Sequence, residues 1–293
     1  MAGTELTRIT IKPTGMRLHE WICFDQGLWA QEGLDPRIDE HHHVGRQGPW
    51  DEYGRRPQDK TFVEGAQAIG NACAWGTVCN AGAGMGKLVP DVHGIARWAI
   101  YVRADSPIRQ PADLANVPIA VGYRAGSHYN VPYRLREFLP LDQIQIAQAG
   151  GYQARLDALL DGEVEATSLL DPQIAMADQL GLRPVIANTF HTYWWVDART
   201  PRDVLARYFN ALERAERELQ RDASRYLHLW RWSMAPEQRE RGWDFSRFHE
   251  GEHFVRQPIP RAEYDEVLAH LAEWGLDDVM LEKDFDRLAL ASG

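Results

Sequence analysis

The segment from Ala112 to Phe138 reads ADLANVPIAVGYRAGSHYNVPYRLREF. Within it, the apolar run VPIAVGY from Val117 to Tyr123 contains β-branched residues and predicts a buried strand. A small polar loop follows, and then a helix. A strand that enters a helix through such a loop leaves free backbone N–H groups, which together with the helix dipole attract an anion. The segment therefore predicts either an anion-binding loop or an ordinary tight turn.

The residues of this loop are the first candidates for a binding site. They are Gly126, Ser127, His128 and Tyr129. Ser127 and Asn130 are both suitable N-cap residues. Pro132 fits best in the first turn of a helix, and this favours Asn130 as the cap. We expect the backbone amides to hold the acidic group of a ligand, with one further hydrogen bond from the Ser127 hydroxyl.

Several short pieces around this segment resemble one family, the SsuA/THI5-like (NMT1) substrate-binding proteins. The pieces are DSPI at 105–108, ADLA at 112–115, PIAVG at 118–122, GSHY at 126–129, QGLWAQEGL at 26–34, LDGEVEA at 160–166 and Asp171-Pro172. They occur in the family's order and cover roughly residues 8 to 195. Members of this family serve the uptake of sulfonates, taurine, nitrate and thiamine precursors.

The resemblance implies an α/β fold of the type 2 periplasmic-binding class. Two lobes would meet across a cleft, and a C-terminal helical segment would wrap around the first. We expect lobe I to comprise residues 1–104 and 191–293, and lobe II residues 105–190. Each lobe should have a sheet of its own, so a single continuous sheet would contradict this division. An ABC-transporter permease is the partner that the resemblance implies.

Three further candidates lie at the predicted ends of strands and near the return to lobe I. Trp75 is expected to end a strand at 71–76, and ligands bind at strand ends in open α/β sheets. Trp194 lies near the hinge, and both tryptophans would provide flat apolar walls. Asp171 would either cap the helix that follows it or accept a hydrogen bond from the ligand, and the cap is the favoured role.

Residues in two N-terminal loops complete the candidate site. The resemblance places Thr14 and Gly15, in the turn after the strand at 7–12, beside the cleft, although Thr14 is also a plausible helix cap. In the run His41-His42-His43, neighbouring side chains of an extended chain point to opposite sides, so the three are poorly placed to bind one metal. His41 and His43 could bind one if a third ligand, such as His93 or His128, came from elsewhere in the chain. We expect no bound metal and no cofactor, and we place His42 and His43 in a polar loop lining the cleft.

Composition limits the function further. A formal net charge of −10 argues against nucleic-acid binding. No run in the sequence reaches 18 apolar residues, so we expect no membrane-spanning helix. The N-terminus lacks the pattern of a secretory signal, so we expect a cytoplasmic protein, or a periplasmic one if a natural signal has been removed. Three cysteines form no metal pattern and leave at least one free thiol. Cys23 is expected to be a core residue.

Two classes of function remain open. The first is a binding protein that closes on a small organic acid, aromatic or heteroaromatic, and this is the preferred interpretation. The second is a cytosolic enzyme on the same fold, such as a decarboxylase, desulfinase or other lyase acting on an aromatic acid. The histidine-rich loops favour an enzyme, because histidine titrates near neutral pH. No complete catalytic set can be named, and this favours binding.

Overall fold

The structure of the chain is a computed structural model that describes residues 6–12, 17–38 and 68–293. Its strands form one sheet in the order β2-β1-β3-β9-β5-β8-β6-β7, with β10 paired to β5 and β4 paired to β9. The strands are β1 (Thr7–Lys12), β2 (Leu34–Ile38), β3 (Ala68–Cys73), β4 (Lys87–Leu88), β5 (His93–Val102), β6 (Pro118–Val121), β7 (Gln145–Gln148), β8 (Ala166–Leu169), β9 (Arg183–Val196) and β10 (His253–Val255).

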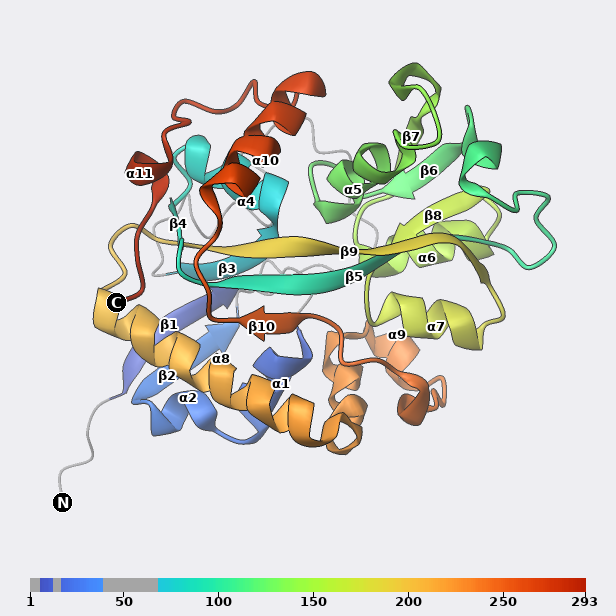
Figure 1. Cartoon of the computed structure of the whole chain (residues 1–293). Helices are drawn as coiled ribbons and strands as arrows, with labels where there is room; N and C mark the ends of the chain where they lie inside the picture. The colour runs from blue at the N-terminus through green and yellow to red at the C-terminus, as the bar shows by residue number, and fades with distance from the viewer. Residues whose placement is uncertain (1–5, 13–16, 39–67) are drawn as a thin grey trace.

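The helices fall into two groups at the two ends of this sheet (Figure 1). Around β1–β3 lie α1 (Leu18–Asp25), α2 (Leu28–Gln31), α4 (Ala74–Gly82), α8 (Arg202–Asp222), α10 (Arg261–Glu273) and α11 (Phe285–Leu288). Around β6–β8 lie α5 (Gly126–Leu135), α6 (Tyr152–Leu160) and α7 (Gln173–Gln179). The short helix α9 spans Pro236–Arg239. Five 3₁₀ segments complete the description: η1 (Pro111–Leu114), η2 (Leu141–Gln143), η3 (Ala223–Arg225), η4 (Leu227–Ser233) and η5 (Phe245–Arg247).

Two long strands connect the groups. In Figure 1, β5 and β9 run across the middle of the molecule. The end of β9 pairs with β3, from Thr192 to Val196, and the rest of β9 pairs with β5. The end of β5 pairs with β8. The expectation of two separate sheets is therefore wrong, because β5 and β9, of 10 and 14 residues, are long enough to serve both groups. By the criterion stated above, the single sheet argues against lobes with sheets of their own. The boundaries at 104/105 and 190/191 stay a prediction, and the second falls within β9.

Hydrophobic residues pack on both faces of the sheet and explain the apolar strands. Successive residues of a strand point to opposite faces. Accordingly, Trp98 and Ile100 of β5 belong to one core cluster, while Ala99 and Tyr101 belong to the other. The three cysteines are buried and form no disulfide with one another, and Cys23 lies in the core as expected. In the described part of the chain, no helix has both the length and the apolar character needed to cross a membrane.

Several predicted elements are shifted or divided in the structure. The apolar face formed by Trp21, Phe24 and Leu28 predicts one helix over 16–32. In the structure α1 and α2 are separated at Gly27, which has the positive φ of 60° that suits glycine. The strand expected at 71–76 is β3, which ends at Cys73. Helix α5 begins four residues before Asn130, with Ala125 at the N-cap and Pro132 inside the helix. Neither Ser127 nor Asn130 is therefore its cap.

Candidate functional site

A largely enclosed cavity lies where the two groups of elements meet. We call it the central cavity, and its volume is about 80 Å³. Its lining comes from the end of β3, the beginnings of α4, α5 and α6, the strands β5 and β9, and the segment after β8. A space of this size holds several water molecules. Because both groups of elements contribute to it, the central cavity is the best candidate for a ligand site in a two-lobed fold.

The first turns of two helices meet at one wall of the central cavity. Cys73 is the N-cap of α4, where its Sγ accepts a hydrogen bond from the Gly76 amide at 3.3 Å. Opposite, Gly126 begins α5, and a Cβ added there would lie 3.5 Å from the Cβ of Cys73. The amides of Gly126 and Ser127 donate to no other described residue. The helix starts therefore bring unpaired N–H groups to the cavity wall.

A cation and an acid also line this cavity. Arg97 comes from β5, and Asp171 follows β8. The β5–β8 pairing matches Ala99 with Leu169, so extending it by two residues places Arg97 opposite Asp171. Within the described residues, the Arg97 side chain makes no hydrogen bond or ion pair, and both carboxylate oxygens of Asp171 are buried without a hydrogen-bond partner. Both groups are thus available to a ligand.

The environment of Asp171 changes its titration. Burial raises its pKa from 3.8 to about 6, while the positive charge of Arg97 opposes this rise and the negative charges of Asp178 and Glu250 add to it. Helix α7 has Pro172 at its N-cap and no side-chain cap. The favoured role of Asp171 as a helix cap is therefore wrong, because its carboxylate lies at the cavity instead.

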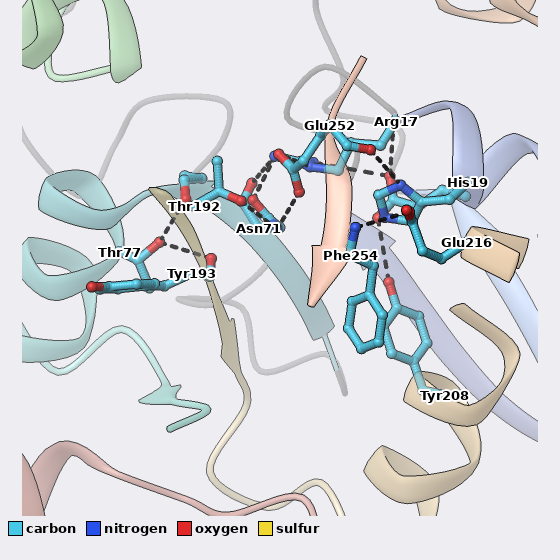
Figure 2. Close-up of polar contacts among 12 residues, drawn as sticks. Arg17, His19, Asn71, Thr77, Thr192, Tyr193, Tyr208, Glu216, Glu252 and Phe254 are labelled. Carbon is cyan, nitrogen blue, oxygen red and sulfur yellow. Dashed lines mark hydrogen bonds and ion pairs between the residues drawn. The ribbon is translucent and has the colours of Figure 1, made fainter. Parts of the chain in front are cut away.

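The floor of the cavity is a paired polar cluster (Figure 2). Arg17 Nε lies 2.6 Å from Glu252 Oε2, and its Nη2 donates to Asn71 Oδ1 at 2.5 Å. Asn71 in turn donates to Glu252 Oε1 at 3.0 Å and to Thr192 Oγ1 at 3.3 Å. Burial raises the pKa of Glu252, and Arg17 opposes this rise. Because Arg17 and Glu252 are both buried, their pairing limits the cost of removing two charges from water.

A second set of contacts, made by Glu216 and His19, supports this cluster. Glu216 of α8 accepts hydrogen bonds from His253 Nδ1 at 2.9 Å and from the Phe254 amide at 3.0 Å (Figure 2). The Glu216 hydrogen bond raises the pKa of His253. His19 packs nearby with its Nδ1 3.2 Å from the Glu252 carbonyl oxygen, and burial lowers its pKa to about 3. His19 is therefore neutral near pH 7 and acts structurally.

The apolar walls of the cavity are aromatic, but they are not the two predicted tryptophans. The aromatic side chains that line it are Tyr152, Phe190, Trp195 and Trp230. Trp194 is fully buried in the core, where it packs against Phe209 and Phe254. The placement of Trp194 in the wall is therefore wrong by one residue. The side chains of Phe209 and Phe254 pack against the Trp194 ring, and Trp194 is not part of the cavity lining.

Trp75 also lies away from the central cavity. It is the second residue of α4, and its ring packs 4.9 Å from that of Tyr133. It lines a separate, more open pocket together with His191, Glu263 and His270. The expectation failed because the strand ends at Cys73, and the chain has already turned into the helix at Trp75.

Most of the predicted anion loop is structural, with the exception of Gly126. Ser127 is buried, and its Oγ accepts a hydrogen bond from the Gly122 amide at 2.8 Å. The Nδ1 of His128 accepts a hydrogen bond from the Arg124 amide at 3.0 Å, and His128 lines a different pocket on the outer side of α5. Tyr129 is fully buried and stacks on Trp75. Gly126 alone of the four lines the central cavity.

Four predicted residues lie outside the described part of the chain: Thr14, Gly15, His42 and His43. The same holds for His41. Among the residues that are described, no group of three His, Cys, Asp or Glu side chains is arranged to hold a metal ion.

Sequence reasoning did not identify Arg17, Cys73 and Arg97. A signal for Arg97 is present in the strand ARWAIYVR at 96–103, where a cation interrupts an otherwise apolar strand. Cys73 gives no comparable signal, because the sequence does not fix where β3 passes into α4. Arg17 lies at the boundary of a predicted helix, and its partner Glu252 is 235 residues away in the chain.

Comparison with known proteins identifies the fold. No family model and no curated protein sequence matches the chain. Among solved structures, the periplasmic aliphatic sulphonate-binding protein SsuA from Escherichia coli matches with a TM-score of 0.69 and 15% identity, over 97% of this chain and 96% of that one. The alkanesulfonate-binding protein SsuA from Xanthomonas axonopodis pv. citri, bound to MOPS, matches with a TM-score of 0.67 and 16% identity, over 99% and 100%.

The chain has the two-lobed fold of the periplasmic binding proteins. An enzyme shares it: a mutant of the desulfurization enzyme DszB in complex with biphenyl-2-sulfinic acid matches with a TM-score of 0.62 and 13% identity, over 97% of this chain and 96% of that one. At these identities the likeness establishes the periplasmic-binding-protein fold and leaves the ligand open, because one fold serves several functions.

Proposed function

We propose that this chain is a substrate-binding protein that captures a small organic acid in the central cavity. The observation that carries the proposal is the position of Arg97. Its guanidinium has no partner among the described residues, and it lines an enclosed space together with the first turn of α5. A guanidinium and free amides at a helix start are both donors suited to a carboxylate, sulfonate or sulfinate.

The aromatic lining supports a planar ligand. Tyr152 of α6, Phe190 and Trp195 of β9, and Trp230 of η4 provide apolar surface around the charged groups. Binding sites commonly combine such surface with a few polar groups that fix orientation. An aromatic or heteroaromatic acid is therefore the preferred ligand, and its ring would occupy the aromatic side of the central cavity while its acid group faces Arg97.

The transport role rests on the periplasmic-binding-protein fold. The two SsuA proteins with this fold are described as binding alkanesulfonates or aliphatic sulphonates. By analogy, we propose an ABC permease as the partner of this chain and the periplasm as its place of action.

The experiment is isothermal titration calorimetry with alkanesulfonates, arylsulfonates, arylsulfinates and benzoates. Arg97→Gln should weaken binding of the best acid roughly 10- to 100-fold, because a hydrogen bond to a charged group contributes about 1.5–3 kcal/mol. Arg109→Gln is the matched control, since Arg109 is exposed and does not line the cavity. Unchanged affinity in Arg97→Gln would place the acid group elsewhere, and binding by no acid would refute the proposal.

A lyase on the same fold is the second candidate, and Cys73 is the observation that favours it. Its thiol lines the central cavity at the start of α4, where an amide donates to Sγ. Helix starts lower the pKa of a cysteine and increase its nucleophilicity. Conversion of an aromatic sulfinate or carboxylate by the parent, abolished in Cys73→Ala but retained in Cys79→Ala, would support the enzyme. Binding without turnover in the parent would exclude it for those substrates.

A further inference from the structure

The carboxylate of Asp171 is a buried acid whose charge is not matched by a hydrogen bond. Neither oxygen is exposed to solvent, and neither has a hydrogen-bond donor among the described residues. The helix that follows does not use it as a cap. Asp178, an acid that acts on Asp171, does have a partner. It accepts a hydrogen bond from the Tyr101 hydroxyl at 2.6 Å. A buried polar group without a partner is costly, so such groups are normally paired with protein, water or ligand.

The cation nearest in the sheet does not fill this role. Arg97 and Asp171 each lie two residues beyond the last β5–β8 pair, Ala99 with Leu169, and the charge of Arg97 acts on the Asp171 carboxyl. Nevertheless, the two side chains form no hydrogen bond and no ion pair within 4.0 Å. Both line the central cavity. The cavity therefore presents one cation and one anion separated by more than direct contact, and a molecule that bridges them would satisfy both.

The charges of the two groups specify what such a molecule carries. Arg97 presents a guanidinium, whose N–H donors suit an acid group. Asp171 is ionised at pH 7.5, above its raised pKa of about 6, and a carboxylate only accepts hydrogen bonds. The strongest donor to a buried carboxylate is a cation, because charge-assisted hydrogen bonds are roughly twice as strong as neutral ones. The bare acid of the proposed function would leave Asp171 unmatched.

We propose that the ligand of the central cavity is a zwitterion, with an acid group bound by Arg97 and an ammonium group bound by Asp171. This inference rests on the proposed function, since it assigns the second end of the same ligand. The ligand and the two side chains together contribute no net charge to the cavity. A hydroxy acid would supply a neutral donor to Asp171 and rank between the bare acid and the ammonium acid.

Calorimetry at pH 7.5 with two matched series tests the inference. One series is ethanesulfonate, 2-hydroxyethanesulfonate and 2-aminoethanesulfonate. The other is benzoate, 3-hydroxybenzoate and 3-(aminomethyl)benzoate. In at least one series, the ammonium compound should bind the parent at least tenfold more tightly than the bare acid. In Asp171→Asn this preference should disappear, while the affinity for the bare acid is kept or improved.

The outcomes separate the two proposals. If bare acids bind as tightly as their ammonium counterparts in both series, the zwitterion inference is wrong and the acid-binding function stands. If the ammonium preference survives in Asp171→Asn, another group binds the amine and the assignment to Asp171 is wrong. If no compound of either series or of the wider acid panel binds, the proposed function fails, and the inference fails with it. The ligand comparison uses the parent protein, so it holds even if the variant folds poorly.

Discussion

Arg97 and Asp171 line the same cavity, two residues beyond the last β5–β8 pair, and no hydrogen bond or ion pair joins them. Opposite charges that lie close together normally stabilise each other. Here each remains unmatched within the described structure, in contrast to Arg17 and Glu252, which pair directly a short way along the same cavity. Arg17 and Glu252 therefore satisfy each other, whereas Arg97 and Asp171 can each still bind a ligand.

Asp171→Asn should stabilise the unliganded protein near pH 7.5. The folded pKa of about 6 lies above the ordinary value of 3.8, so ionisation opposes folding. The difference corresponds to about 3 kcal/mol at full ionisation. This destabilising free energy is absent below about pH 4 and develops as the pH rises through 6. Arg97, Asp178 and Glu250 act on this carboxyl in both directions.

We therefore expect a gain of about 1–3 kcal/mol at pH 7.5, less the cost of an unpaired amide, and little or none at pH 4. Urea unfolding of parent and variant at both pH values measures it. A gain of equal size at the two pH values would show that the effect does not come from the charge of Asp171.

Gly126→Ala should weaken ligand binding without loss of stability. The added Cβ would lie 3.5 Å from Cys73 Cβ and 3.9 Å from Phe190 Cε2, which are ordinary contact distances, and it would project into the cavity lining. It would obstruct approach of an acid group to the first amides of α5. We expect at least a tenfold loss of affinity by calorimetry and a melting temperature equal to or above that of the parent. Parent-like affinity would show that the ligand does not approach this helix start.

Arg17→Met should destabilise the protein by about 3–5 kcal/mol, because it leaves Glu252 buried without its cation. Adding Glu252→Gln to Arg17→Met removes the stranded charge and should restore part of the loss. Chemical denaturation of the parent, both single variants and the double variant gives the coupling energy. Additive effects in this cycle would contradict a direct interaction between the two side chains.

Trp194 and Trp195 should respond differently to replacement by Phe, although they are adjacent. Trp194 is in the core against Phe209 and Phe254, so its replacement should mainly reduce the free energy of unfolding. Trp195 lines the central cavity, so its replacement should mainly reduce ligand affinity. Unfolding curves and calorimetry on both variants distinguish the two effects. The reverse pattern would mean that the faces of β9 are assigned wrongly.

The order of strands and helices in the second group was predictable because each has a local signal. The run VPIAVGY indicates a buried strand and corresponds to β6. The sequence also predicts a helix over 153–160, and this corresponds to α6. The site was less predictable, because it depends on the residue at which each strand or helix ends and on the direction in which each side chain points. Strand β3 ends at Cys73 and α4 begins at Ala74, so Trp75 lies in the helix and not at a strand end. Trp195 rather than Trp194 lines the cavity. The pairing of Arg17 with Glu252 depends on tertiary structure, which leaves no local pattern.

The continuity of β5 and β9 has a consequence for how this chain can be divided. A fragment of residues 105–190 would keep β6, β7 and β8 but lose β5, and the edge of β8 that β5 covers would be exposed. Exposed strand edges promote aggregation. Exchanging ligand specificity between homologues by transplanting this fragment would therefore fail unless residues 93–102 travelled with it. Because β5 and β9 connect the two groups of elements, neither group can be exchanged without them.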